Sequence, residues 1–177
     1  MSRKDSNWLS GSGKLVNRAN DISAYLAALL ILFLTVLVTY SIAARHFQFA
    51  YPIWQTQVSE YIILWSTFLG AAWLLRKGGH VKVDFLLTRL NPRARVVLAV
   101  IETVIGTACS LVLVLFGAYV TWDLWQRGII DVRAIDVPKF SVMIVIPLGS
   151  LLLFIEFARA LYRASSDLKK NLRKLET

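Results

Sequence analysis

Four long apolar runs, separated by short polar connections, dominate the hydrophobic pattern of this chain. The first run, Ile22 to Ala44, holds no charged residue. As an α-helix with a rise of about 1.5 Å per residue it is long enough to cross the roughly 30 Å hydrocarbon core of a bilayer. Similar runs lie at about 53–75, 93–122 and 138–162. The pattern therefore predicts an all-α integral membrane protein with four transmembrane helices, and we treat residues 1–177 as a single membrane domain.

A basic, glycine-containing turn follows the second run. Residues 76–80 read Arg-Lys-Gly-Gly-His, and an amphipathic segment at about 81–90 comes next. This segment is too short to span a membrane, and its apolar positions recur at i, i+3, i+4 and i+7, which is typical of a helix lying in the membrane interface. We call it the interfacial arm. Its apolar positions are Val83, Leu86, Leu87 and Leu90.

Prolines mark the start of the last run and a point within it. The connection 123–137 is polar, and Asp136 is expected to cap the fourth helix with Pro138 in its first turn. Within that helix, Pro147 and Gly149 predict a kink, because proline cannot donate a backbone hydrogen bond.

Composition and charge favour a membrane protein with a defined orientation. Hydrophobic residues make up 56% of the chain and the mean hydropathy is +0.57, whereas soluble domains contain about 45–50% apolar residues. The net charge of +9 does not indicate nucleic-acid binding, because the basic residues flank the apolar runs. Sixteen lysines and arginines lie on the side of the termini and the arm, against four on the other side. The positive-inside rule therefore places both termini in the cytoplasm.

Few residues suggest chemistry. We take Glu60 and Glu102 as the acids closest to the hydrocarbon, and interpret them either as proton or ion sites or as acids near a helix N-terminus that face a partner helix. His46 and His80 fall on opposite sides of the predicted membrane, so they cannot ligate one haem. The sequence contains no nucleotide-binding loop, catalytic triad or metal cluster. We therefore expect neither an enzyme nor a cofactor in this chain.

Two further groups have a structural interpretation beside a functional one. The basic residues around the arm either contact anionic lipid headgroups or only determine the topology; they are Arg76, Lys77, Lys82 and Arg89. Small residues inside the second and third runs permit close helix approach; they are Gly70, Ala71, Ala72, Gly106, Ala108 and Gly117.

The stretch from Trp65 to Asp84 resembles the DctQ-like small membrane subunit of tripartite ATP-independent periplasmic (TRAP) transporters. The resemblance rests on an acid early in the second helix, a small-residue patch, a basic-glycine-histidine exit and a Val-Asp pair. A proline and a glycine in the last helix, Pro147 and Gly149, also match. The residues that carry the second-helix motif are Glu60, Gly70, Arg76, Gly79, His80, Val83 and Asp84.

The resemblance implies a scaffold subunit in the bacterial inner membrane. A periplasmic binding protein would deliver an organic acid to a complex of this chain and a large membrane subunit, which would carry substrate and sodium. The interfacial arm would brace the complex at the cytoplasmic surface. Two alternatives stay open at this point: a haem-free membrane anchor of an electron-transfer enzyme, and a small oligomeric exporter, which would need an essential membrane acid such as Glu60 or Glu102.

Overall fold

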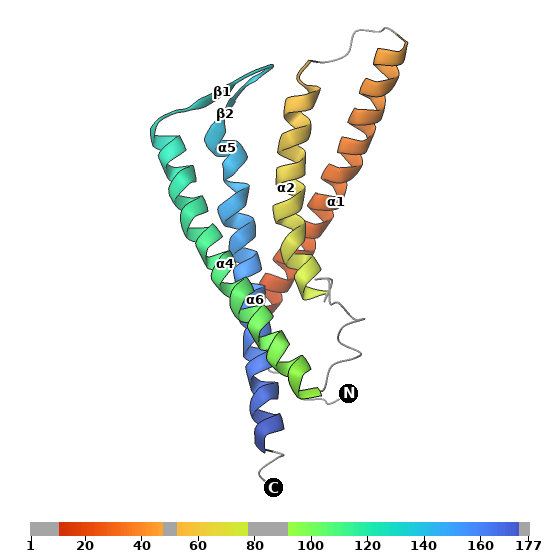
Figure 1. The fold of residues 1–177 in the computed structure, drawn as a ribbon. Coiled ribbons are helices and arrows are strands. Elements are labelled where there is room, and N and C mark those ends of the chain that lie inside the picture. The colour runs from red at the N-terminus through yellow and green to blue at the C-terminus, as the bar shows by residue number, and fades with distance from the viewer. Residues whose placement is uncertain (1–10, 48–52, 78–91, 174–177) are drawn as a thin grey trace.

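The computed structural model describes residues 11–47, 53–77 and 92–173, with side chains described at 14–47, 53–77 and 97–165. It consists of long helices, with a small β-hairpin at one end (Figure 1). The first two helices are α1 (Gly11–His46) and α2 (Gln55–Arg76). Both are long and apolar enough to cross a membrane.

The second half of the chain supplies two more spans. Helix α4 (Pro92–Gln126) forms the third span, and α5 (Lys139–Met143) and α6 (Val145–Arg173) together form the fourth. The four-helix, all-α membrane fold predicted from the apolar runs is therefore confirmed. The helices α1 and α4 continue beyond those runs. The 35 residues of α4 extend to roughly 50 Å, whereas the hydrocarbon core takes up about 30 Å.

The helices associate in two pairs. Helix α1 packs against α2 and α4 against α6, while α2 also contacts α6 and so joins the pairs. Figure 1 shows the pairs diverging toward the end that carries the hairpin. Many large apolar side chains of the spans are exposed on the isolated chain. This is the expected surface of helices that lipid or another membrane subunit covers.

Glycines mark the points where the helices approach most closely. A Cβ atom added to Gly149 of α6 would lie 2.7 Å from the backbone oxygen of Phe68 in α2. A Cβ atom at Gly106 of α4 would lie 2.3 Å from the Phe157 ring of α6. Gly117 likewise approaches Ile146 and Pro147. Of the small residues predicted to permit close packing, Gly106 and Gly117 therefore do so within this chain, whereas Ala108 is exposed.

The polar connection between the third and fourth spans forms a hairpin, which was not predicted. After α4 ends, Gly128 adopts a left-handed φ of +60°, a conformation that glycine tolerates best. Strands β1 (Ile130–Val132) and β2 (Asp136–Pro138) then pair antiparallel, with Ile130 opposite Pro138. The expectation that Asp136 caps the fourth helix is wrong, because Asp136 pairs with Val132 in the sheet and Pro138 precedes α5 without a side-chain cap.

The break between α5 and α6 falls at Ile144, one turn before Pro147. Proline at position 147 cannot donate to the carbonyl of Met143, so the helical ladder is interrupted there. The predicted kink thus lies close to the proline-glycine pair.

The interfacial arm lies outside the described residues, as do Gly79, His80, Lys82, Asp84 and Arg89. The arm, its proposed brace role and the cytoplasmic placement of the termini stay predictions.

Candidate functional site

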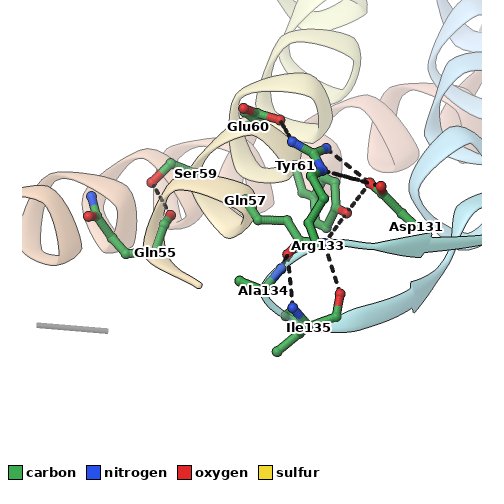
Figure 2. A network of polar contacts seen from close by, with 9 residues as sticks. All are labelled: Gln55, Gln57, Ser59, Glu60, Tyr61, Asp131, Arg133, Ala134 and Ile135. Carbon is green, nitrogen blue, oxygen red and sulfur yellow. Dashed lines mark hydrogen bonds and ion pairs between the residues drawn. The ribbon is translucent and has the colours of Figure 1, made fainter. Parts of the chain in front are cut away.

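A network of polar contacts joins the start of α2 to the hairpin. The side chain of Gln57 is buried, with 3% of its surface exposed. Its Oε1 atom accepts hydrogen bonds from the backbone N–H groups of Ala134 and Ile135, each at 3.0 Å. Its Nε2 atom donates to the Ile135 carbonyl at 3.0 Å and to the Tyr61 hydroxyl at 2.7 Å. Figure 2 shows Gln57 beside the hairpin turn, with its contacts to Ala134 and Ile135 dashed. One side chain thus satisfies three backbone groups of the turn.

Charged side chains surround this contact. Arg133 donates to Glu60 at 2.8 Å and to Asp131 at 2.9 Å (Figure 2). The Tyr61 hydroxyl donates to Asp131 at 2.7 Å, so Tyr61 accepts from Gln57 and passes its own hydrogen bond on to the hairpin. We call Gln57, Glu60, Tyr61, Asp131 and Arg133 the hairpin cluster.

The charges of the cluster stabilise one another. Hydrogen bonds from Arg133 and then from Tyr61 hold the pKa of the Asp131 carboxyl below its usual range. Hydrogen bonds to Asp131 and Glu60 raise the pKa of the Arg133 guanidinium above its already high value. Both shifts favour the charged forms. Because Glu60 and Arg133 are each about half exposed, their pair contributes little alone, and its value lies in fixing the hairpin geometry.

An open cleft of about 470 Å³ lies beside the hairpin cluster. Glu60, Tyr61, Asp131 and Arg133 line it together with Lys139, and Leu64, Val142 and Met143 form its apolar side. The acids and Arg133 already bond to one another. The arrangement therefore acts as a clamp between α2 and the hairpin.

A second polar cluster joins α1 to α6 near the opposite end of the bundle. Glu156 of α6 is 5% exposed and accepts a hydrogen bond from Asn20 Nδ2 of α1 at 2.7 Å. It also accepts from Arg159 at 3.0 Å, and Arg159 donates to Asn17 Oδ1 at 3.3 Å. A buried carboxylate needs such partners, because burial alone strongly disfavours its charged form.

Arg76 extends this second cluster to α2. It donates to the backbone carbonyl of Asn17 at 2.9 Å and pairs with the Asp21 carboxylate. The inner cluster, as we call Asn17, Asn20, Asp21, Arg76, Glu156 and Arg159, therefore connects α1, α2 and α6. Arg76, which the sequence suggested for lipid contact, is engaged within the chain.

The structure separates the other residues singled out from the sequence. Glu60 lies in the hairpin cluster on α2, whereas Glu102 is exposed on α4. Gly70 faces Ala27 of α1, with 3.8 Å available to an added Cβ atom. Lys77 is exposed, with its ammonium 5.7 Å from the centre of the Trp73 ring. His46 ends α1 beside Phe47. Glu60 and Glu102 thus do not form a common site.

Sequence reasoning missed three residues that organise these clusters: Gln57, Asn20 and Glu156. For Glu156 a signal exists, because Glu156 and Arg159 stand at i and i+3 inside an apolar helix, where charges are rare unless they pair. For Gln57 and Asn20 the sequence offers no comparable sign.

The fold and the two clusters define a multi-pass helical membrane protein whose spans are linked to one another by polar contacts at both ends. Residues 34–167 match the family described as tripartite ATP-independent periplasmic transporters, DctQ component. The chain belongs to this family, whose members are transporter components rather than enzymes. The predicted resemblance is confirmed, and the matched region contains the whole hairpin cluster together with Arg76, Glu156 and Arg159.

Curated relatives show the same similarity. The chain is 28% identical over 112 residues to the C4-dicarboxylate TRAP transporter small permease protein DctQ of Pseudomonas aeruginosa, covering 62% of this chain and 53% of that protein. It is 24% identical over 101 residues to the ectoine TRAP transporter small permease protein TeaB of Halomonas elongata, covering 57% and 52%. The DctQ protein of Rhodobacter capsulatus is 23% identical over 110 residues, covering 62% and 48%. The aligned part of the chain spans about half the length of each relative.

Proposed function

We propose that this chain is the fixed scaffold subunit of a TRAP transporter in the bacterial inner membrane. In this proposal a periplasmic binding protein delivers an organic acid to a large membrane subunit, which carries the substrate together with sodium. The chain itself holds no cofactor. The family membership supports the transporter, and the relatives' names, which include C4-dicarboxylate and ectoine transporters, support a small organic substrate.

The observation that carries the scaffold role is the clamping of the helices at both ends. Gln57 joins α2 to the hairpin between α4 and α5, and Glu156 joins α6 to α1. Between these ends, Gly149 lets α6 approach the backbone of α2 at Phe68. Helices fixed to one another at several levels suit a static support better than a moving transport element.

The hairpin supports a more specific role at the outer face. With both termini in the cytoplasm, as the distribution of basic residues favours, the hairpin faces the periplasm. It exposes apolar side chains, with Ile130 52% and Val132 72% exposed. Its turn is held in place by the hydrogen bonds of Gln57. We propose that this surface helps to receive the binding protein, while the arm at 81–90 braces the opposite, cytoplasmic face.

Affinity purification of the tagged chain from its native membranes in mild detergent, with partners identified by mass spectrometry, tests the proposal. A large polytopic protein in equal amount is the expected result. Sodium-dependent uptake of an organic acid that requires both proteins would extend it to transport. Recovery of a redox enzyme in place of a polytopic protein, or of the chain alone as an oligomer, would contradict it.

A Glu60→Gln variant separates the scaffold from the exporter alternative. Glu60 forms an exposed ion pair at the hairpin, so its neutralisation is expected to leave assembly and uptake nearly unchanged. An exporter that uses Glu60 as its proton or ion site would lose transport while remaining folded. Glu102→Gln, at an exposed position of α4, is the matching variant for the second acid.

A further inference from the structure

An open groove of about 750 Å³ runs between α1 and α2. Alanine and glycine residues of both helices contribute to its lining, because α1 and α2 present small residues to each other along this stretch. These residues are Ala24, Ala27, Ala28, Gly70 and Ala71. The groove lies between two membrane spans, so hydrocarbon rather than water surrounds it.

The groove has the length of one membrane leaflet. Along α1 it extends from Asp21 to Ile31, and along α2 from Ser66 to Lys77. These eleven and twelve residues correspond to roughly 16 Å of helix, which is about half of the 30 Å hydrocarbon core. A transmembrane helix of a partner, which crosses both leaflets, would extend well beyond the groove. An acyl chain of a single leaflet fits the observed one.

The charged end of the groove carries one exposed cation. Arg76 is occupied by Asn17 and Asp21, whereas Lys77 is exposed and none of the carboxylates in the described part of the chain pairs with it. Its ammonium lies over the Trp73 ring, and tryptophan and tyrosine at this level are typical of the membrane–water interface. Tyr25 lines the same end. Lys77 is thus placed to meet a phosphate at headgroup depth.

We propose that the groove binds one phospholipid with an anionic headgroup, its acyl chain lying between α1 and α2 and its phosphate on Lys77. The lipid would fill the space that the small residues leave between the two helices. This inference concerns the lipid side of the subunit and does not depend on the transport proposal.

Native mass spectrometry of the full-length chain in mild detergent, supplied with equal amounts of phosphatidylglycerol and phosphatidylethanolamine, tests the headgroup contact. The wild type is expected to retain one molecule of phosphatidylglycerol in preference to phosphatidylethanolamine. Lys77→Gln should reduce that retention about fivefold, the effect of one lysine at a membrane surface. The control Lys14→Gln removes the same charge from α1 outside the groove and should behave as wild type. Equal losses in both variants, or no preference in the wild type, would overturn the proposal.

Filling the groove tests the position of the acyl chain. Ala28 is exposed in the groove, so Ala28→Phe should reduce retention of both lipids, whereas Ala108→Phe at an exposed position of α4 should not. A photo-crosslinking residue at position 28 in native membranes should yield lipid adducts. Unchanged lipid retention by Ala28→Phe, or crosslinks to another protein in place of lipid, would overturn the assignment.

Discussion

The side chain of Gln57 and the backbone of Ile135 form two reciprocal hydrogen bonds. Gln57 Nε2 donates to the Ile135 carbonyl and the Ile135 N–H donates to Gln57 Oε1, both at 3.0 Å. The amide therefore pairs with the hairpin turn as a neighbouring strand would, and it fixes the hairpin, the only β-structure in the described part of the chain, to the start of α2.

Removing this amide is expected to release the hairpin. Gln57→Ala leaves up to three backbone groups of the turn without their partner, which corresponds to about 1–3 kcal/mol of folding free energy. A lower melting temperature in detergent and faster proteolysis within 127–138 are the expected measurements. Gln55→Ala is the matched control, because Ser59 bonds only the backbone carbonyl of Gln55 and alanine keeps that group. Equal behaviour of the two variants would contradict the clamp.

Acid should weaken the attachment of the hairpin through Asp131. Arg133 and Tyr61 lower the pKa of Asp131 in the folded chain, below the value of about 3.9 in the unfolded chain. The charged form is therefore stabilised above about pH 4, and this contribution is lost as the pH falls through the lower, folded pKa.

Comparison of melting temperatures between pH 6 and pH 3 checks this dependence. Other carboxylates titrate in the same window, so the difference between the wild type and Asp131→Asn isolates Asp131. We expect the variant to be less stable at pH 6 and the gap to narrow as the pH falls. Parallel curves would show that Asp131 does not contribute.

Close packing between α2 and α6 gives a prediction about an added group rather than a removed one. Gly149→Ala places a methyl group 2.7 Å from the Phe68 carbonyl oxygen, and the backbone of α2 cannot yield as a side chain can. Overpacking of this kind costs about 1–3 kcal/mol. Gly70→Ala is the control, since its added Cβ atom would meet Ala27 at an ordinary 3.8 Å. Thermal melting should separate the two variants, and similar stabilities would argue against the close approach.

The sequence predicted what depends on local pattern. The four apolar runs predicted the four spans, and Pro147 predicted the break in the last helix. Both could be predicted because hydrophobic length and the missing proline N–H act within one segment. The hairpin escaped prediction because strands of three residues show no useful alternation.

The two clusters could not be predicted for a different reason. Gln57 and Ile135 are 78 positions apart, and Asn20 and Glu156 are 136 apart. Such contacts exist only after the helices have packed, and neither glutamine nor asparagine carries a periodic signal. Arg76 illustrates the consequence, because its position at a basic membrane exit suggested lipid contact although its partners are Asn17 and Asp21.

Glu156 and Arg159 provide the strongest test of the inner cluster. Removing one member, as in Glu156→Leu or Arg159→Leu, leaves a mostly buried charge without its partner, and such losses cost about 3–5 kcal/mol. Removing both together should cost less than either alone, because no unpaired charge remains and leucine suits an apolar surrounding. A double-mutant cycle measured by thermal or chemical unfolding in detergent provides the coupling. Additive losses would mean that the two side chains stabilise the chain independently, and the link between α1 and α6 would then consist of two separate contacts, Asn20 with Glu156 and Asn17 with Arg159.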